Sequence, residues 1–160
     1  MDLLKLLFGR TSRRRRRRSY SILSLFKIFG GSGSLRRWSG RARKGTVDYN
    51  AFKMRKKYPT TRLGFFGTMG KNKTNKKSPV RVVKSKNQFT TARDFYLRIG
   101  KGGTEKRLSN GHGVRKIMKD KGLVVYRPKT STKESPAIDL TNMNGFIRNQ
   151  KIHFIKGEKD

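Results

Sequence analysis

An excess of positive charge is the feature that most limits how this chain can fold. The 160 residues include 42 Lys and Arg against 9 Asp and Glu, which gives a formal net charge of +33. A compact protein with this charge repels itself unless an anionic partner neutralises it. Because only 32% of the residues are hydrophobic, we expect one core of about 70 residues rather than a core that involves the whole chain. The sequence thus predicts a small folded domain next to a long basic segment.

The charge also restricts the class of partner. Nucleic acids are the most common partners of strongly basic proteins, and their binding weakens steeply with salt. An anionic membrane surface is the alternative. Residues 19–29 (SYSILSLFKIF) follow a run of arginines, and they can be interpreted as a signal peptide or as a short amphipathic helix that touches a membrane transiently. No stretch reaches the roughly 18 apolar residues that a transmembrane helix needs.

Composition divides the chain into three parts. Residues 1–29 form a basic segment with short amphipathic helices, residues 30–88 form a basic arm or linker rich in Gly, Lys and Arg, and residues 89–160 form a compact module. The arm has aromatic side chains among its cations, a pattern that suits base stacking together with phosphate contact. An unfolded basic arm explains the same pattern. The first segment contains the unbroken run Arg13, Arg14, Arg15, Arg16, Arg17 and Arg18.

Hydrophobic periodicity predicts the fold of the module. A short strand is expected at residues 80–84, and a capping box predicts a helix from Thr91 to about Ile99. Three segments rich in β-branched or aromatic residues follow at 123–127, 137–140 and 151–155. The turns between them are too short for crossover connections. We therefore expect the α+β class: an N-terminal helix packed on a small antiparallel β-sheet, preceded by a long basic, largely irregular arm.

Two histidines in this module carry the available acid–base chemistry. The chain has no cysteine, which excludes thiolate zinc sites, disulfides and cysteine nucleophiles, and we expect neither a metal nor another cofactor. A ribonuclease without a metal needs a base for the 2′-hydroxyl, an acid for the leaving oxygen and a cation for the phosphate charge. His112, in a glycine-rich loop, and His153, in the last strand, titrate in the useful range. Both can equally be structural residues.

The candidate site residues follow from this requirement. The catalytic candidates are the acid–base residues His153 and His112 and the phosphate-charge residues Arg127, Lys151 and Lys116. The nucleic-acid-binding candidates are Lys106, Arg107, Arg115 and Lys119, together with the arginine run at residues 13–18.

Residues 92–154 resemble a known group of proteins. The pattern includes Gly111-His112-Gly113-Val114-Arg115, Val125-Tyr126-Arg127-Pro128 and Lys151-Ile152-His153-Phe154. It resembles the C-terminal toxin domains of bacterial polymorphic toxins, of the contact-dependent, Rhs and LXG types, which are grouped with ribonucleases of the barnase, colicin and RelE kind. The resemblance implies a metal-independent ribonuclease, an antiparallel sheet with an N-terminal helix, and a cognate acidic immunity protein. It also places Thr130 and Ser131 among the recurrent polar residues of such domains, which adds their hydroxyls to the catalytic candidates as groups that orient the phosphate. Such domains usually end a very long delivery protein, a pattern from which this chain departs.

These observations lead to two functional hypotheses. The first is an endoribonuclease toxin that cleaves cellular RNA, tRNA or rRNA, by attack of the 2′-hydroxyl, and that acts in the cytoplasm, that of a target cell if the protein is secreted. The second is a non-catalytic structural RNA-binding protein of the ribosome-associated type with a basic tail. The two differ in turnover, because only the first cleaves its RNA.

Overall fold

The computed structural model describes residues 42–70, 79–131 and 135–157. The chain divides into two units, Met1–Gly30 and Gly31–Asp160, and all described residues belong to the second unit. The arginine run, the expected N-terminal helices and the first part of the expected arm therefore lie outside the described residues. Within the described ranges, no helix is long and apolar enough to cross a bilayer.

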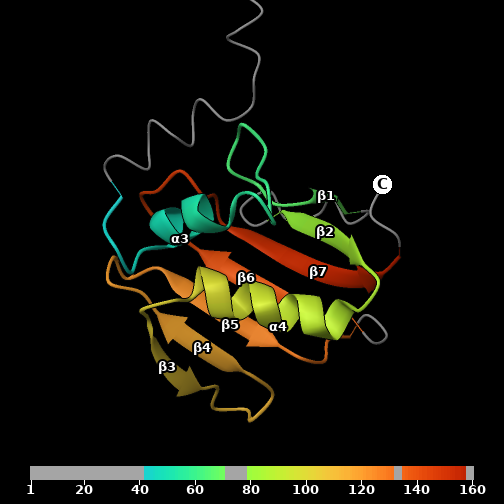
Figure 1. Ribbon diagram of the computed structural model, residues 1–160. Helices are drawn as coiled ribbons and strands as arrows, with labels where there is room; N and C mark the ends of the chain where they lie inside the picture. Colours follow the sequence, from blue (N-terminus) through green and yellow to red (C-terminus); the bar gives the residue numbers. More distant parts are fainter. Residues whose placement is uncertain (1–41, 71–78, 132–134, 158–160) are drawn as a thin grey trace, which may run out of the picture. The chain divides into compact units, whose positions relative to one another are not determined.

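The described part of the chain is an α+β fold with two helices and one seven-stranded sheet (Figure 1). The strand order across the sheet is β1-β2-β7-β6-β5-β4-β3. The elements are α3 (Val47–Met54), β1 (Thr68–Met69), β2 (Val80–Ser85), α4 (Gln88–Ile99), β3 (Thr104–Arg107), β4 (Val114–Ile117), β5 (Leu123–Arg127), β6 (Ala137–Thr141) and β7 (Gln150–Lys156).

The expected α+β class is confirmed, but the sheet is larger than expected and is not wholly antiparallel. β2 and β7 pair in parallel, and every other neighbouring pair is antiparallel. The parallel pair arises because the chain leaves β2, forms α4, and then adds β3 to β6 before β7 returns beside β2. The last strand of the chain is therefore inserted between β2 and β6, so that early and late parts of the described chain pair within one sheet.

α4 supplies the centre of the core. Its side chains Ala92, Phe95, Tyr96 and Ile99 are buried, as the periodicity predicted, and the helix ends before Gly100. The predicted N-cap at Thr91 is wrong. The helix begins one turn earlier because the side chain of Asn87 accepts a hydrogen bond from the Thr90 N–H at 3.1 Å.

The predicted irregular arm differs most from the structure. Residues 42–70 and 79–88 belong to the folded unit, and α3 lies with α4 on the same face of the sheet (Figure 1). The core includes Val47, Ala51 and Met54 from α3, and also Tyr58 and Phe66 from the segment that follows. The three α3 side chains repeat at helical spacing and form one apolar stripe. The sheet and α4 cover this stripe, and its burial stabilises the helix.

Asp48 fixes α3 to the connection between β6 and β7. Its buried carboxylate accepts hydrogen bonds from the Asn142 Nδ2 at 2.8 Å and from the backbone N–H groups of Phe146 at 2.8 Å and Ile147 at 3.0 Å. The acceptor is charged, so each of these bonds is stronger than a neutral one. The negative charge also reduces the self-repulsion of a very basic protein.

We expect the substitution Asp48→Asn to lower the free energy of unfolding by about 2 kcal/mol, because the amide places a donor against donors that are already buried. The measurement is urea denaturation. Asp120→Asn is the matched control, since it removes the same charge from an exposed turn and should cost less than about 0.5 kcal/mol. Equal losses in the two variants would show that Asp48 acts through net charge alone.

Candidate functional site

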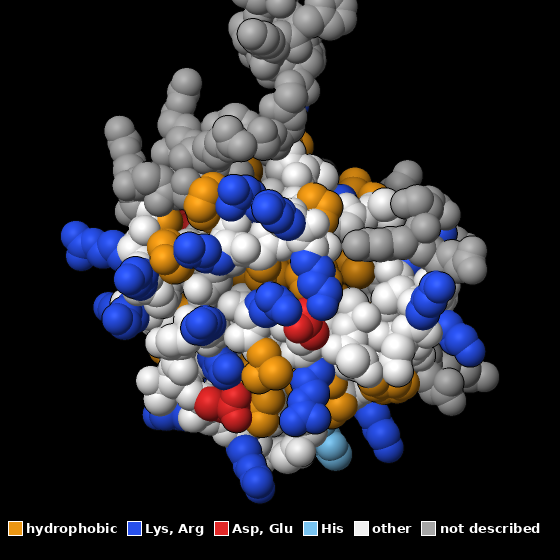
Figure 2. Space-filling model, viewed as in Figure 1, with side chains coloured by type: hydrophobic (Ala, Val, Ile, Leu, Met, Phe, Trp, Pro, Cys, Tyr) orange, Lys and Arg blue, Asp and Glu red, His pale blue; other side chains and the backbone are white. Residues whose placement is uncertain are grey.

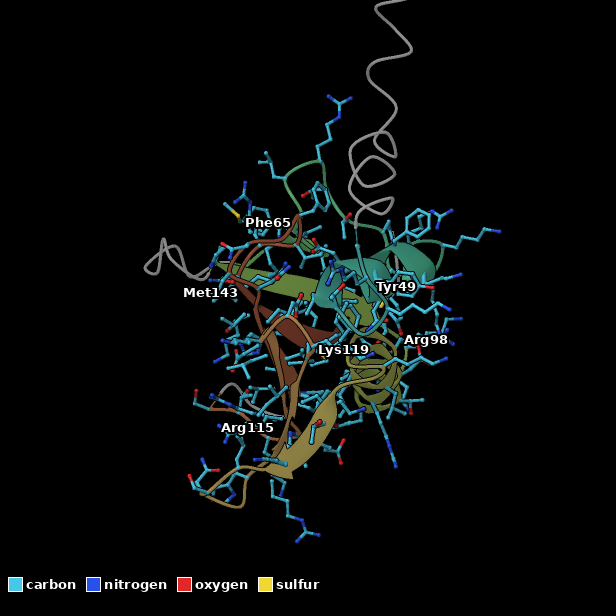
Figure 3. The ribbon with its side chains drawn as sticks, turned by 90° about the vertical axis from the view of Figure 1, so that its left-hand side faces the viewer. Tyr49, Phe65, Arg98, Arg115, Lys119 and Met143 are labelled. Carbon is cyan, nitrogen blue, oxygen red and sulfur yellow. The ribbon has the colours of Figure 1, made fainter. Side chains whose placement is uncertain are left out.

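The two faces of the sheet have different surroundings. Ile138, Leu140, Ile152 and Phe154 point toward the helices and are almost completely buried. Because side chains alternate along a strand, the residues between them point to the opposite face. Neither α3 nor α4 covers this second face, which we call the open face; Arg98 on α4 and Arg115 on β4 lie on opposite sides of the sheet (Figure 3).

Charged side chains form a row across the open face. The strand register places Lys106 opposite Arg115, Arg115 opposite Val125, Val125 opposite Asp139, and Asp139 opposite Lys151. Side chains directly opposite in a sheet lie about 5 Å apart at Cβ. The row therefore presents three cations and one carboxylate on neighbouring strands.

A pocket of about 330 Å³ lies at the Arg127 end of β5. Its walls come from the connection between β3 and β4, the end of β5 with the connection that follows it, and β7. The lining residues are Asn110, His112, Arg127, Lys129, Thr130, Ser131 and Lys151. Five of the seven predicted catalytic residues therefore line one pocket: His112, Arg127, Thr130, Ser131 and Lys151.

The connection between β3 and β4 is a defined turn that holds His112 at the pocket. Its backbone closes through Leu108 N–H to Gly113 O and Gly111 N–H to Leu108 O, both at 3.0 Å. The His112 N–H donates to Asn110 Oδ1 at 3.1 Å. Gly113 packs against the carbonyl oxygen of Tyr126 so closely that a Cβ atom would collide with it. The exposed imidazole is thus carried by a turn fastened to β5.

An ion pair orients Arg127. The Arg127 Nη2 lies 3.1 Å from the Asp139 Oδ2, and the Arg127 side chain remains 46% exposed. A charge-assisted hydrogen bond of this kind fixes the plane of the guanidinium while leaving its other N–H groups available. Asp139 is therefore a positioning residue for the cation at the pocket.

His153 is on the open face but does not line the pocket. Its register partners are Ala137 on β6 and Val82 on β2, and the residue is only 9% exposed. Its Nδ1 lies 3.0 Å from the Ser135 Oγ. Burial, and next the positive charge of Lys151, lower the pKa of His153, while Asp139 acts in the opposite direction. The lowered pKa favours the neutral imidazole of His153, which is covered, whereas the His112 side chain is exposed.

None of the other predicted residues in the described ranges lines the pocket, and three of them also lie away from the row on the open face. Lys116 lies on the helix side of the sheet, 3.7 Å from the Glu105 carboxylate and over the Tyr96 ring. Arg107 pairs with Val114, a core-facing residue, so it also belongs to the helix side. The Lys119 side chain packs against Gly45. By contrast, Lys106 and Arg115 lie on the open face, as the row above shows.

Positive charge is not confined to the open face. The helix side also carries many Lys and Arg side chains, with few carboxylates and with apolar patches between them (Figure 2). Charge alone therefore does not identify a site, and the combination of an imidazole, cations and hydroxyls in the pocket is the more specific feature.

Sequence reasoning missed three residues of this region: Asn110 and Lys129 in the pocket wall, and Asp139 behind Arg127. Asn110-Gly111 is a turn signal that could have drawn attention to Asn110. Alternation along residues 137–140 places Asp139 opposite the buried Ile138 and Leu140. Its partner Arg127 could not be found this way, because the pairing depends on the register between β5 and β6.

The lowered pKa of His153 predicts a pH dependence of stability. Between the folded pKa and the ordinary value of 6.5, the folded protein binds fewer protons at this residue than the unfolded chain. The free energy of unfolding therefore falls as the pH falls through this window. We expect His153→Gln to lose less stability than the wild type between about pH 7.5 and about pH 5.5. Urea denaturation at both pH values tests this, with the exposed His112→Gln as the control. If His153→Gln lost as much unfolding free energy as the wild type between these pH values, the pH dependence would not come from His153.

Comparison with known proteins finds no family model, no curated protein and no solved structure that matches this chain.

Proposed function

We propose that the open face of the sheet binds RNA and that the pocket at the end of β5 cleaves it without a metal ion. The observation that carries this proposal is the pocket lining: one exposed imidazole, three cations and two hydroxyl groups meet on a face that neither helix covers. These are the groups that an internal attack of the 2′-hydroxyl on phosphorus requires.

The open face supports binding of a polyanion. Lys106 and Arg115 face each other on β3 and β4, and like charges directly opposite in a sheet are destabilising. A phosphate that contacts both cations removes this repulsion. Arg127 and Lys151 place further cations at the pocket, so a backbone lying across the strands meets cations at both ends of the row, with Val125 and Asp139 between them. Its binding should weaken with salt through counterion release.

Each pocket residue has its own role in the proposed reaction. The His112 imidazole accepts the proton of the 2′-hydroxyl, whose oxygen attacks the adjacent phosphorus and forms a 2′,3′-cyclic phosphate. The bond to the 5′-oxygen breaks, and this oxygen takes a proton from the Lys151 ammonium group, which solvent then reprotonates. Arg127 and Lys129 stabilise the negative charge on the phosphate oxygens in the transition state. The Ser131 hydroxyl orients the phosphate, whereas the Thr130 hydroxyl donates to the Ser135 carbonyl oxygen at 2.8 Å and so holds the connection after β5.

This assignment uses the residues that the pocket brings together. His153 is not given a proton-transfer role, because it is covered and bonded to Ser135. Lys116 is not given a phosphate role, because it lies on the helix side of the sheet. In the described ranges, no group of three His, Cys, Asp or Glu side chains could hold a metal ion, and the proposed steps use side chains of the chain itself.

One observation favours the second candidate, a non-catalytic RNA-binding protein. Of the two histidines, only His112 lines the pocket, so two-histidine acid–base catalysis is not available in this arrangement. A structural RNA-binding protein would use the same basic face without turnover. It would shift intact RNA on a native gel, and no cleavage product would form.

The resemblance to polymorphic-toxin domains suggests a biological role and a protein partner for the proposed ribonuclease. An endoribonuclease of this kind would act as a toxin on cytoplasmic tRNA or rRNA, and an acidic immunity protein would bind the open face and cover the pocket. The row of cations on that face has the charge that such a partner needs.

We expect the purified protein to cut tRNA or rRNA in the presence of EDTA into discrete fragments that end in a cyclic phosphate. The substitution His112→Ala should lower the rate by about 10²–10⁴-fold, the usual size of a general acid–base contribution, while RNA binding remains. His153→Gln is the control, since it alters the other histidine away from the pocket. The measurement is the single-turnover rate on a denaturing gel. If the wild-type protein left the RNA intact, the cleavage proposal would be wrong and the non-catalytic RNA-binding protein would be the remaining candidate.

A further inference from the structure

A second concave region lies away from the pocket, between the segment that follows α3, strand β2 and the first turns of α4. It consists of two adjoining cavities of about 380 and about 470 Å³. The two cavities are neighbours, because four residues line both of them: Lys57, Tyr58, Val83 and Lys84. We call this region the Tyr58 groove. None of its lining residues lines the proposed cleavage pocket.

One compartment of the groove is mostly apolar. Phe66, Phe95, Val82 and Val83 contribute to its wall. Phe66 and Phe95 pack edge to face, with ring centroids 4.9 Å apart, so this part of the wall is rigid. Hydroxyl groups lie among the apolar side chains, since Thr60, Thr61 and Thr68 line the same compartment. A flat heteroaromatic ring with polar edges matches this combination better than an alkyl chain does.

The other compartment is basic. Lys57, Lys84 and Lys86 contribute to its wall. The nearby carboxylate of Asp94 is already shared between Lys57 Nζ and Arg98 Nε, each at 2.9 Å, and the Tyr58 hydroxyl at 2.8 Å. Desolvation works against this, but the three hydrogen bonds leave the pKa of Asp94 below its ordinary value. Asp94 therefore stays ionised, and its partners are Lys57, Tyr58 and Arg98 rather than Lys86.

Ser85 gives an independent indication of a ligand. It lines the basic compartment, and its Oγ is the one buried side-chain oxygen or nitrogen among the described residues that has no hydrogen-bond partner. Buried hydroxyl groups without a partner are uncommon because they lose the hydrogen bonds that water would make. A phosphate oxygen bound in this compartment is an acceptor that would complete the hydrogen bonding of this hydroxyl.

We propose that the Tyr58 groove binds a nucleoside phosphate, with the base in the apolar compartment and the phosphate at Lys57, Lys84, Lys86 and Ser85. The source of this group is either the terminal nucleotide of an RNA chain or a free mononucleotide. The first turn of α4 reinforces the phosphate end, because Thr91 lines it and the helix N-terminus carries partial positive charge. This site is separate from the cleavage pocket, so it stands or falls independently of RNA cleavage.

The test uses the full chain and two variants with matched controls. Ser85→Ala removes the unpartnered hydroxyl, and Lys86→Gln removes a cation; Ser109→Ala and Lys101→Gln are the controls, because they make the same changes at exposed positions that line neither the groove nor the cleavage pocket. Binding of nucleoside 5′- and 3′-monophosphates is measured by calorimetry, beside adenosine, inorganic phosphate and laurate. Oligonucleotides with a phosphate at the 5′ end, at the 3′ end or at neither end distinguish an RNA terminus from a free nucleotide.

We expect Ser85→Ala and Lys86→Gln each to weaken nucleotide binding by about fivefold or more, with little effect from the controls. Ser85→Ala should also leave the thermal midpoint unchanged or raise it, since the hydroxyl has no partner to lose. A purely structural serine would not show both results. Unchanged nucleotide affinity in both variants would overturn the proposal. So would inorganic phosphate binding as tightly as the nucleotides, or laurate binding more tightly. RNA cleavage by Ser85→Ala at the wild-type rate would show that the two sites are distinct.

Discussion

The packing of Phe95 is the contact on which the rest of this structure depends. Its ring lies 5.0 Å from Tyr58, 4.9 Å from Phe66 and 5.5 Å from Phe154, each in an edge-to-face arrangement. These partners come from the segment after α3, the approach to β1, and β7, so one buried side chain on α4 joins parts that are distant in sequence. Such pairs contribute about 0.5–1.5 kcal/mol each beyond their buried area. In a chain with a net charge of +33, this concentrated apolar contact offsets repulsion that is spread over the surface.

Because the large apolar side chains of the sheet point toward α3 and α4, charged side chains are left on the open face, where they can contact a ligand. With α3 and α4 on the same side, the alternate residues of β5, β6 and β7 remain on the open face. There Arg127, Asp139 and Lys151 are held by strand register rather than by loops. Only His112 and the residues after Arg127 lie on connections. The proposed catalytic group thus combines a rigid cationic platform with a short turn that positions the imidazole.

Sequence patterns predicted the elements that have strong local signals and missed those that depend on partners. The strands at β2, β5, β6 and β7 and the buried face of α4 follow from hydrophobic patterning. β3 could not be predicted in this way, because all four residues of Thr104–Arg107 are exposed and the strand exists through pairing with β4. α3 had a readable signal in Val47, Ala51 and Met54, which the surrounding lysines and arginines obscured. Five of the predicted catalytic residues line one pocket, among them His112, Arg127 and Lys151, and their roles stay a prediction; the covering of His153 depends on how Ser135 is placed.

The central claim is that location on the open face, and not charge, makes the cations functional. Arg127 and Arg107 allow a direct comparison, since both end a strand and both are exposed, but they lie on opposite sides of the sheet. The measurement is the single-turnover cleavage rate of RNA by Arg127→Gln and by Arg107→Gln at one salt concentration. We expect Arg127→Gln to lower the rate by about 10²-fold or more, as loss of a transition-state charge contact does, and Arg107→Gln to change it by less than about threefold. Equal losses in the two variants would contradict the account.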